Sequence, residues 1–338
     1  MRVTFLCPHL RIAGGVRAIL TYADRLARRG HEVVVVVPGR RTWWGGVREG
    51  ARPDWIGEFL PRVEWVGRWT ADALPAADAL VATAWQTAAA VAAAPPRAGR
   101  RFYFVQHYES LYHGPADLVD ATYRLPLRTI VISTWLHDVL REKFGRDAEI
   151  LVTPVDPALF HRVAAPRAPG PPRVLMLQHE AAWKGVADGM EAVRRVRATG
   201  GVLTLVGFGL KAPPDGVRYD EFHANPPQPS LAELYSGVDV YLCPSWDEGL
   251  GMPAMEAMAC GAALVTYDNG GCRDYARDGA TALVARRRDV PALAAALERL
   301  LNDGALRRHL AAAGEAYIRT QFDWDRAVAR MENLLAGC

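Results

Sequence analysis

The sequence predicts an α/β protein made of two doubly wound domains, each with a parallel sheet. Apolar runs short enough to be strands alternate along the chain with longer segments of helical periodicity. This order appears near the start of the chain and again from about residue 173. Between the two series, residues 164–172 hold four prolines and a glycine, which indicates a linker rather than the interior of an element.

The first series opens with Val3–Cys7, an apolar run that we expect to form a strand, and continues with a loop that holds Gly14 and Gly15. Residues 19–27 are apolar at spacings of three and four, which is typical of a helix with one packed face. Val33–Val37 are five consecutive valines. Such a run predicts a strand buried on both faces, as in a parallel sheet.

The second series has the same order. A strand is predicted at Val174–Leu177, a loop follows with Lys184 and Gly185, a helix is predicted at Val186–Val196, and the next strand at Val202–Val206. Further strands are predicted at 79–82, 102–106, 129–132, 238–243 and 263–266, and further helices at 231–236, 253–260, 290–301, 305–319 and 322–335. We expect the first domain at 1–165, the second at 172–321, and a C-terminal helix within 322–338 that packs back across the first domain.

Composition and charge restrict the partners. The 338 residues are 50% hydrophobic and 23% charged, as in an ordinary globular protein, and the formal net charge is +3. Residues 1–160 hold 20 basic and 16 acidic residues, a net +4, which permits contact with an anionic membrane surface. The sequence has no block of Lys and Arg, so a nucleic-acid partner is not expected.

The five cysteines lack the paired spacing of a metal site, and we expect buried thiols rather than disulfides. The sequence shows no signal-peptide pattern and no apolar run long enough to span a membrane. These features predict a cytoplasmic protein, and the charge of the first half leaves open a peripheral contact at the inner membrane face.

The segment with the clearest chemistry follows the strand predicted at 238–243. Its loop carries Glu248 and two glycines, and Pro253 suits the first turn of the helix that holds Glu256. The glycines let a ligand approach the backbone, and N–H groups ahead of the proline can bind an anion or hydroxyl groups. The two carboxylates are suited to accept hydrogen bonds from sugar hydroxyl groups. The alternative is an exposed helix residue at Glu256 and a carboxylate at Glu248 that only stabilises the helix dipole.

This segment resembles the signature of the family 4 retaining glycosyltransferases. Seven residues separate Glu248 from Glu256, Pro244 and Ser245 precede them, and Ala-Met-Ala-Cys-Gly follows at 257–261. The resemblance extends over nearly the whole chain and is weakest at about residues 40 to 95. It implies the GT-B fold, in which two Rossmann-like domains face a central cleft that holds the active site.

The resemblance also implies roles for the motif. The second glutamate of the family holds the ribose of the nucleotide, and Glu256 matches it. The first contacts the donor hexose, and Glu248 matches it. The loop residues between them, Gly249, Leu250 and Gly251, are then expected at the donor as well.

Family members have an arginine five residues before a Lys-Gly pair, and both basic side chains hold the donor diphosphate. Lys184 and Gly185 match the pair, and lysine is a suitable point charge for phosphate. His179 stands where the family has the arginine. A protonated His179 could bind the phosphate, or Arg173 or another arginine could replace it. Lys184 could also be a solvated loop residue.

Two further matches fall in the first domain. Gly14 and Gly15 occupy the first β–α loop, where the family has a glycine pair against the diphosphate and acceptor; an ordinary turn is the alternative. His107 follows a predicted strand, at the position of a family histidine near the reacting face of the transferred sugar; a polar strand end is the alternative. Tyr108, Glu109, Tyr112 and His113 follow and could line the acceptor pocket.

Two short motifs carry no function. Gly207 and Gly209 lack the third glycine of a dinucleotide fingerprint, so NAD is rejected. Asp323-Trp324-Asp325 resembles the Asp-x-Asp of metal-dependent GT-A transferases, but it lies at a predicted helix start, where it serves as a cap. We therefore expect neither a metal nor a cofactor.

The resemblance implies transfer of a hexose from a nucleoside-diphosphate sugar to an acceptor hydroxyl, with retention of the anomeric configuration. His107, Lys184 and Glu248 are the residues expected to be catalytic. UDP is favoured over GDP and dTDP as the nucleotide, and the acceptor is a glycan, a glycolipid or a small natural product. The alternatives are a nucleotide-sugar epimerase or phosphorylase on the same fold, or a catalytically silent sugar-binding protein.

Overall fold

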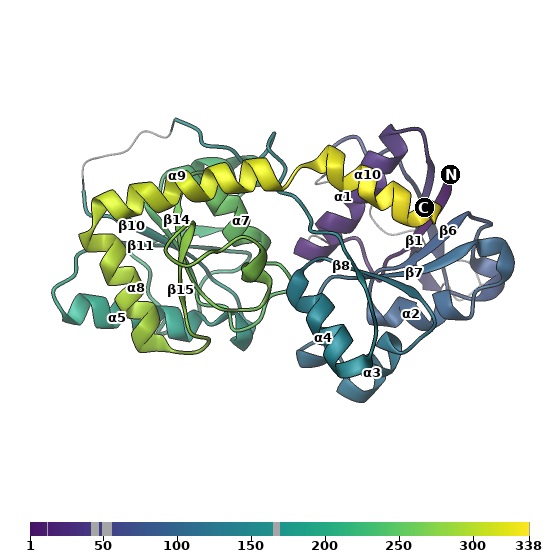
Figure 1. Cartoon of the computed structure of the whole chain (residues 1–338), viewed down its shortest axis with the longest axis horizontal. Helices are drawn as coiled ribbons and strands as arrows, with labels where there is room; N and C mark the ends of the chain where they lie inside the picture. Colours follow the sequence, from purple (N-terminus) through teal and green to yellow (C-terminus); the bar gives the residue numbers. More distant parts are fainter. Residues whose placement is uncertain (12, 42–46, 49–55, 165–169, 338) are drawn as a thin grey trace. The chain divides into compact units, whose positions relative to one another are not determined.

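A computed structural model of the chain describes residues 1–11, 13–41, 47–48, 56–164 and 170–337. The chain divides into two compact units, and each is described by itself (Figure 1). Unit 1 comprises Met1–Thr153 and Trp324–Cys338, and unit 2 comprises Pro154–Asp323. The segment 40–95, where the family resemblance is weakest, lies partly outside the described residues.

Unit 1 contains a seven-stranded parallel sheet with the strand order β5-β2-β1-β6-β7-β8-β9, and β3 pairs with β4 separately. Its strands are β1 (Arg2–Leu6), β2 (Glu32–Pro38), β3 (Arg40–Arg41), β4 (Val47–Arg48), β5 (Arg62–Val66), β6 (Ala79–Ala82), β7 (Arg100–Val105), β8 (Arg128–Val131) and β9 (Glu149–Ile150). Its helices are α1 (Gly14–Arg28), α2 (Trp85–Ala92), α3 (Ala116–Tyr123), α4 (Thr134–Phe144) and α10 (Trp324–Ala336), with 3-10 turns η1 (Ala71–Ala73), η2 (Pro96–Ala98) and η3 (Glu109–Leu111).

Unit 2 contains a six-stranded parallel sheet with the strand order β12-β11-β10-β13-β14-β15. Its strands are β10 (Arg173–Leu177), β11 (Thr204–Gly209), β12 (Glu221–Ala224), β13 (Val240–Cys243), β14 (Ala263–Tyr267) and β15 (Ala282–Ala285). Its helices are α5 (Val186–Ala198), α6 (Leu231–Ser236), α7 (Met252–Ala259), α8 (Val290–Asn302) and α9 (Gly304–Gln321), with 3-10 turns η4 (Ala182–Lys184), η5 (Gln228–Ser230) and η6 (Gly271–Asp274). Helix α5 packs against α8, and α7 against α9.

Burial explains why the run of valines forms an interior strand. Strand β2 lies between β5 and β1, and every side chain of Val33–Val37 is at most 5% exposed. β-branched side chains fit a pleated surface that is covered on both faces. The predicted strand at 33–37 is thus confirmed, with one more residue at each end.

Each sheet has one place where the chain reverses the direction in which it adds strands. In unit 1, β1 lies between β2 and β6, and in unit 2, β10 lies between β11 and β13. The connections from two such neighbouring strands leave toward opposite faces of the sheet, and a ligand-binding crevice forms at the carboxyl ends of the strands there. In unit 2, Lys184 and Glu248 follow the two strands at this position.

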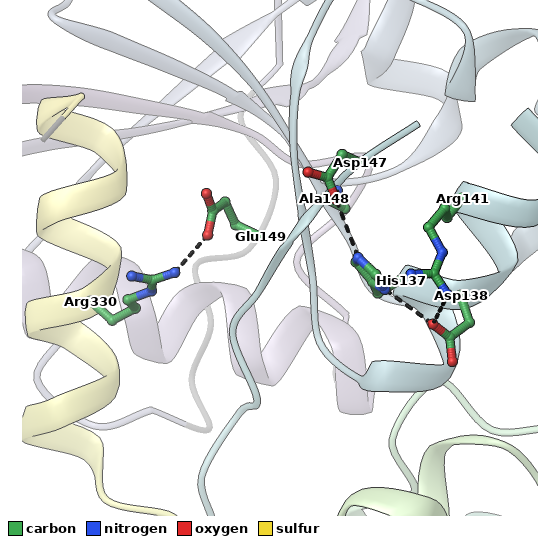
Figure 2. A network of polar contacts seen from close by, with 7 residues as sticks. All are labelled: His137, Asp138, Arg141, Asp147, Ala148, Glu149 and Arg330. Carbon is green, nitrogen blue, oxygen red and sulfur yellow. Dashed lines mark hydrogen bonds and ion pairs between the residues drawn. The ribbon is translucent and has the colours of Figure 1, made fainter. Parts of the chain in front are cut away.

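The C-terminal helix α10 belongs to unit 1, far in sequence from the elements it contacts. Trp324 is 6% exposed and packs against Tyr22 of α1, with ring centroids 4.9 Å apart. Farther along the helix, Arg330 pairs with Glu149 of the edge strand β9 at 2.6 Å, as Figure 2 shows. Nearby in the same view, His137 lies between two aspartates, Asp138 at 3.1 Å and Asp147 at 3.2 Å.

The first boundary between the units differs from the one expected from the proline-rich linker. Unit 2 begins at Pro154, whereas the linker placed the end of the first domain at residue 165. Phe160 packs against Tyr235 with ring centroids 6.1 Å apart, and Arg162 pairs with Glu315 at 3.2 Å. These contacts fasten the segment ahead of the prolines to unit 2, which composition alone does not reveal.

Gly14 and Gly15 are the first two residues of α1 rather than part of the preceding loop, which corrects the expectation from sequence. The first N–H groups of a helix have no partner within the helix, so residues that break helices elsewhere are tolerated at its start. The glycine pair therefore offers N–H groups at the N-terminus of α1.

Within the described ranges, no helix combines the length and the apolar character needed to cross a membrane. Helix α9, with 18 residues, carries charged side chains along its length.

Candidate functional site

Two loops of unit 2 bring Lys184 and Glu248 together. Lys184 ends η4 after β10, and Glu248 lies in the loop after β13, which is the parallel neighbour of β10. Gly185 has a φ of +66°, and a Cβ atom there would lie 1.9 Å from the carbonyl oxygen of Pro244. Only glycine permits this approach of the two backbones, which gives the Lys-Gly pair a structural reason.

The side chains of Lys184 and Glu248 form an ion pair. The Lys184 Nζ atom donates to both carboxylate oxygens, at 2.7 Å to Oε1 and 2.9 Å to Oε2. The lysine side chain is 20% exposed and the glutamate side chain 10% exposed, so the pair is largely withdrawn from water. In such surroundings the loss of either partner leaves a poorly solvated charge. The interpretation of Lys184 as a solvated loop residue is therefore wrong.

The loop between Glu248 and α7 presents backbone N–H groups. The Glu248 N–H donates to the Asn269 carbonyl at 2.9 Å, which fixes the start of the loop. Gly251 adopts a φ of +90°, and a Cβ atom there would lie 2.6 Å from the Tyr275 hydroxyl, so only glycine fits. Within the described residues, no backbone carbonyl accepts a hydrogen bond from the N–H groups of 249–251. Next to the N-terminus of α7, these groups are suited to bind an anion or hydroxyl groups.

Glu256 is the fifth residue of α7 and is 3% exposed. The Tyr235 hydroxyl on α6 donates to its Oε2 atom at 3.1 Å. Tyr235 is itself 1% exposed and is held among three aromatic rings, with centroid distances of 5.7 to 6.1 Å, namely Phe160, Phe208 and Tyr241. The carboxylate is thus oriented by a rigid partner. Glu256 is not an exposed helix residue, which removes that alternative.

His179 and Arg173, the two candidates for a second phosphate-binding residue, occupy different places. His179 is exposed after β10, and its Nδ1 atom accepts a hydrogen bond from the Ala181 N–H at 3.0 Å. Partial desolvation of the ring and then the charge of Lys184 lower the pKa of His179, which disfavours the cation. Arg173 stands at the opposite, amino end of β10 and donates two hydrogen bonds to Glu221 at 2.7 and 2.6 Å. The hypothesis that Arg173 takes the place of the family arginine is therefore wrong.

Trp246 anchors the loop just ahead of Glu248. Its indole N–H donates to Oδ2 of Asp188 on α5 at 2.9 Å, and its backbone N–H donates to the Trp183 carbonyl at 2.7 Å. These contacts hold the Glu248 loop against the loop that carries Lys184. The sequence does not predict the roles of Asp188 and Tyr235, because no short motif signals a contact between a loop and a helix far away in the chain.

The same loops line a small pocket in unit 2. Its lining residues come from β10, β13, the loops after them and the first turn of α7: Leu177, Lys184, Tyr241, Leu242, Cys243, Pro244, Ser245, Glu248, Gly251, Pro253 and Ala254. The pocket therefore joins Lys184, Glu248 and Gly251, three residues that the sequence assigned to the donor.

In unit 1, His107 follows β7, and the residue before it lies next to the start of α1. A Cβ atom on Gly15 would lie 3.5 Å from the Cβ of Gln106, the residue before His107. The His107 ring has three aromatic neighbours at centroid distances of 5.6 to 6.3 Å, namely Tyr112, His113 and Trp135. The structure thus places Gly15 next to Gln106, the residue that precedes His107.

Glu109 fastens the loop after His107 to the N-terminus of α2. Its Oε2 atom accepts a hydrogen bond from the Trp85 N–H at 2.9 Å and another from the Tyr103 hydroxyl at 3.3 Å. The Trp85 indole N–H also donates to the His113 carbonyl at 2.8 Å. Burial raises the pKa of Glu109 to about 7, although both hydrogen bonds act in the opposite direction.

Within the ranges that the structure describes, no group of three or more His, Cys, Asp or Glu side chains could hold a metal ion. Cys7, Cys243, Cys260 and Cys272 are buried thiols. Of the Asp-x-Asp segment, Asp325 lies in the first turn of α10.

Comparison with known proteins relates most of unit 2 to a family of glycosyl transferases. Residues 171–303 match the family model for glycosyl transferases group 1. This segment holds Lys184, Glu248 and Glu256, together with the loops that position them.

Two curated relatives are longer than this chain. The O-antigen biosynthesis protein RfbC of Myxococcus xanthus is 32% identical over 275 residues, which are 78% of this chain and 21% of that protein. A glycogen synthase of Mycobacterium tuberculosis is 31% identical over 208 residues, which are 58% of this chain and 50% of the synthase. The chain thus spans half or less of the length of these relatives.

Two solved structures share the fold along the whole chain. Sucrose-phosphate synthase from Thermosynechococcus elongatus has a TM-score of 0.76 at 18% identity, with 98% of each chain covered. Anabaena Alr3699/HepE, in complex with UDP-glucose, has a TM-score of 0.79 at 15% identity, with 100% of each chain covered. The fold class expected from sequence is thereby confirmed. The protein has the GT-B fold, and its residues 171–303 match the family model for glycosyl transferases group 1.

Proposed function

We propose that the protein is a retaining glycosyltransferase that moves a hexose from a nucleoside-diphosphate sugar to an acceptor hydroxyl without a metal ion. The observation that carries this proposal is the meeting of Lys184 and Glu248 at the reversal of strand order in unit 2. The N–H groups of 249–251 lie in the same loop. A cation and N–H groups suit a diphosphate, and carboxylates suit the hydroxyl groups of a sugar.

The donor is proposed to lie along the loops after β10 and β13. Glu256, oriented by Tyr235, accepts hydrogen bonds from the ribose, and Glu248 accepts them from the hexose. Lys184 and the loop Gly249-Leu250-Gly251 hold the diphosphate, and the neighbouring His179 contacts it in its neutral form. UDP is the first nucleotide to test, because HepE, which shares the fold, was solved with UDP-glucose.

The chemistry proposed is front-face substitution at the anomeric carbon. The bond to the leaving diphosphate breaks, the acceptor oxygen bonds to the same face, and the departing phosphate oxygen takes the proton of the acceptor hydroxyl. Lys184 and the loop N–H groups stabilise the negative charge that develops on the diphosphate. The carboxylates of Glu248 and Glu256 are engaged with Lys184 and Tyr235, which favours this route over a covalent glycosyl intermediate.

The acceptor is proposed to bind in unit 1. The N–H groups of Gly14 and Gly15 at the start of α1, and the aromatic surroundings of His107, offer both hydrogen-bonding groups and apolar faces. The acceptor hydroxyl belongs to a glycan, a glycolipid or a small natural product.

The proposal is tested by thermal shift against UDP-, GDP- and dTDP-sugars, followed by calorimetry on Lys184→Ala and Glu256→Ala. We expect one nucleotide sugar to stabilise the wild type, each variant to bind it at least about tenfold more weakly, and EDTA to have no effect. Unchanged donor binding in both variants would show that the site is wrong.

Product analysis separates the proposed reaction from its competitors. With an acceptor present, NMR of the new glycoside should show the anomeric configuration of the donor. Conversion of the donor sugar without any acceptor would instead identify an epimerase. Donor binding without turnover across an acceptor panel would identify a sugar-binding protein.

A further inference from the structure

The contact between Lys184 and Glu248 joins two groups that a donor would have to use separately. Lys184 Nζ lies 2.7 and 2.9 Å from the two carboxylate oxygens of Glu248, so the lysine donates to both of these oxygens. A diphosphate needs the lysine charge, and a hexose needs the carboxylate oxygens. Binding of the donor therefore requires that this ion pair be exchanged for contacts with the ligand.

The cost of that exchange depends on what replaces each partner. The Glu248 side chain is only 10% exposed, so water can solvate it poorly once Lys184 leaves. Hydroxyl groups of a hexose could take the place of the lysine as hydrogen-bond donors. A nucleoside diphosphate without its sugar has no hexose hydroxyl groups to donate to Glu248. It also brings additional negative charge close to the carboxylate.

We propose that the Lys184–Glu248 ion pair discriminates a nucleotide sugar from the nucleoside diphosphate that remains after transfer. The sugar compensates Glu248 for the loss of Lys184, so the intact donor opens the pair at low cost. Once the sugar has gone, Glu248 draws Lys184 back and weakens the hold on the diphosphate. Glu248 thereby acts both as a ligand for the donor hexose and as an internal competitor of the product.

This inference rests on the proposed function, and it leads to an expectation that a purely sugar-binding Glu248 would not share. Glu248→Gln keeps the shape of the side chain but removes the charge that holds Lys184. We expect the variant to bind UDP roughly tenfold more tightly than the wild type, which is the size expected for the loss of a partly buried ionic competitor. Its affinity for UDP-glucose should change less, because that ligand loses its hexose contact while it gains the lysine.

The experiment is calorimetry with UDP and with UDP-glucose, or with the corresponding pair that the thermal-shift panel selects. The quantity of interest is the ratio of the two dissociation constants, which should fall at least severalfold in Glu248→Gln. Uridine is the ligand control, because it has no phosphate to compete for Lys184. Its affinity should be the same in both proteins.

A matched variant lies in the same unit. Lys211 pairs with Glu180 at 2.8 Å, and both side chains are 72% exposed. Glu180→Gln removes a Lys–Glu pair of similar length that is largely accessible to water, so it should leave both affinities unchanged.

The outcomes separate the inference from the function beneath it. If the wild type binds the diphosphate and Glu248→Gln binds it equally or more weakly, the inference is wrong and the proposed function stands. If the wild type binds no nucleotide or nucleotide sugar of the panel, both are wrong.

A second measurement needs no variant. The sequence contains three lysines, 143, 184 and 211, so the side-chain signals of lysine labelled with 13C at Cε can be resolved by NMR. UDP and UDP-glucose should both shift the Lys184 signal and leave the Lys211 signal in place. An unmoved Lys184 signal in the presence of saturating UDP-glucose would overturn the exchange.

Discussion

At the scale of single residues, the hydroxyl of Tyr235 is the contact on which the orientation of Glu256 depends. Tyr235→Phe removes the hydrogen bond to Oε2 but keeps the ring among its aromatic neighbours. Because hydrogen bonds to carboxylates are worth about 1.5–3 kcal/mol, we expect nucleotide affinity to fall by about tenfold while the fold is retained. Calorimetry measures the affinity, and circular dichroism verifies the fold.

Tyr219→Phe is the matched control, because Tyr219 donates to Gln178 at 2.9 Å in the same unit. It should leave nucleotide affinity unchanged. Equal losses in both variants would mean that Tyr235 acts on the unit in general rather than on Glu256.

The absence of a side chain at Gly185 allows the loops that carry Lys184 and Glu248 to pack closely. A Cβ atom would meet the Pro244 carbonyl, and its φ of +66° is strained for any other residue. We expect Gly185→Ala to lower the free energy of unfolding of unit 2 by about 3 kcal/mol, from backbone strain together with crowding. The added Cβ should also push apart the loops that carry Lys184 and Glu248. This should separate the two side chains and weaken nucleotide binding.

Gly200 provides the control, since its φ is +90° and a Cβ atom there meets nothing within 4 Å. Gly200→Ala should therefore cost only the backbone strain, about 1 kcal/mol, and leave nucleotide binding intact. Chemical unfolding of both variants gives the two free energies, and equal costs would contradict a role for the Pro244 contact.

At the scale of elements, the loop after β7 is tied to α2 through a carboxyl group whose ionisation is unfavourable. Burial raises the pKa of Glu109 from its ordinary value of 4.5 to about 7. A raised pKa means that the folded protein binds the proton more tightly than the unfolded chain. The stability that Glu109 contributes is therefore fully present below about pH 4.5 and is lost as the pH rises to 7.

Glu109→Gln should remove this dependence. Relative to the wild type, the variant should gain about 3 kcal/mol in the free energy of unfolding between pH 4.5 and pH 8. Chemical unfolding at a series of pH values measures the difference, with Glu142→Gln, an exposed residue of α4, as the control. Parallel curves for the wild type and Glu109→Gln would refute the assignment.

At the scale of the whole molecule, α10 is held in unit 1 by an aromatic contact at Trp324 and by ion pairs, among them Arg330 with Glu149 and Glu332 with Arg29. Trp324 is 6% exposed against α1, so Trp324→Ala should cost about 3–5 kcal/mol. Arg330 and Glu149 are each about half exposed, so Arg330→Gln should cost less than about 1 kcal/mol. Thermal unfolding measures both, and a larger cost for Arg330→Gln would reverse this ranking.

Much of the fold can be predicted from the sequence because several strands are continuous apolar runs. The valine run of β2 and the apolar run of β6 have no polar interruption, the run of β14 holds a single threonine, and each of these strands lies inside a parallel sheet. Helix α2 is not predicted, because its sequence is rich in alanine and has no contrast between a polar and an apolar face.

The sequence predicts the residues of the candidate site but not how they are arranged. The motif and the Lys-Gly pair identified Lys184, Glu248 and Glu256, because each residue type has its own chemistry. That Lys184 and Glu248 bind one another, and that Tyr235 holds Glu256, depends on strand order and on the crossing of α6 and α7. No local pattern encodes those relations, since they arise only when distant segments meet.

The inclusion of α10 in unit 1 has a consequence for the order in which the protein can fold during its synthesis. Residues 154–323 form one uninterrupted segment, so unit 2 is complete as soon as that segment has left the ribosome. Unit 1 begins earlier in the chain but lacks α10 until residues 324–338 have been made. Unit 2 can therefore reach its native state before unit 1. Until α10 is made, the surface of α1 around Tyr22 stays exposed, so unit 1 is the part of the nascent chain that is more prone to aggregation.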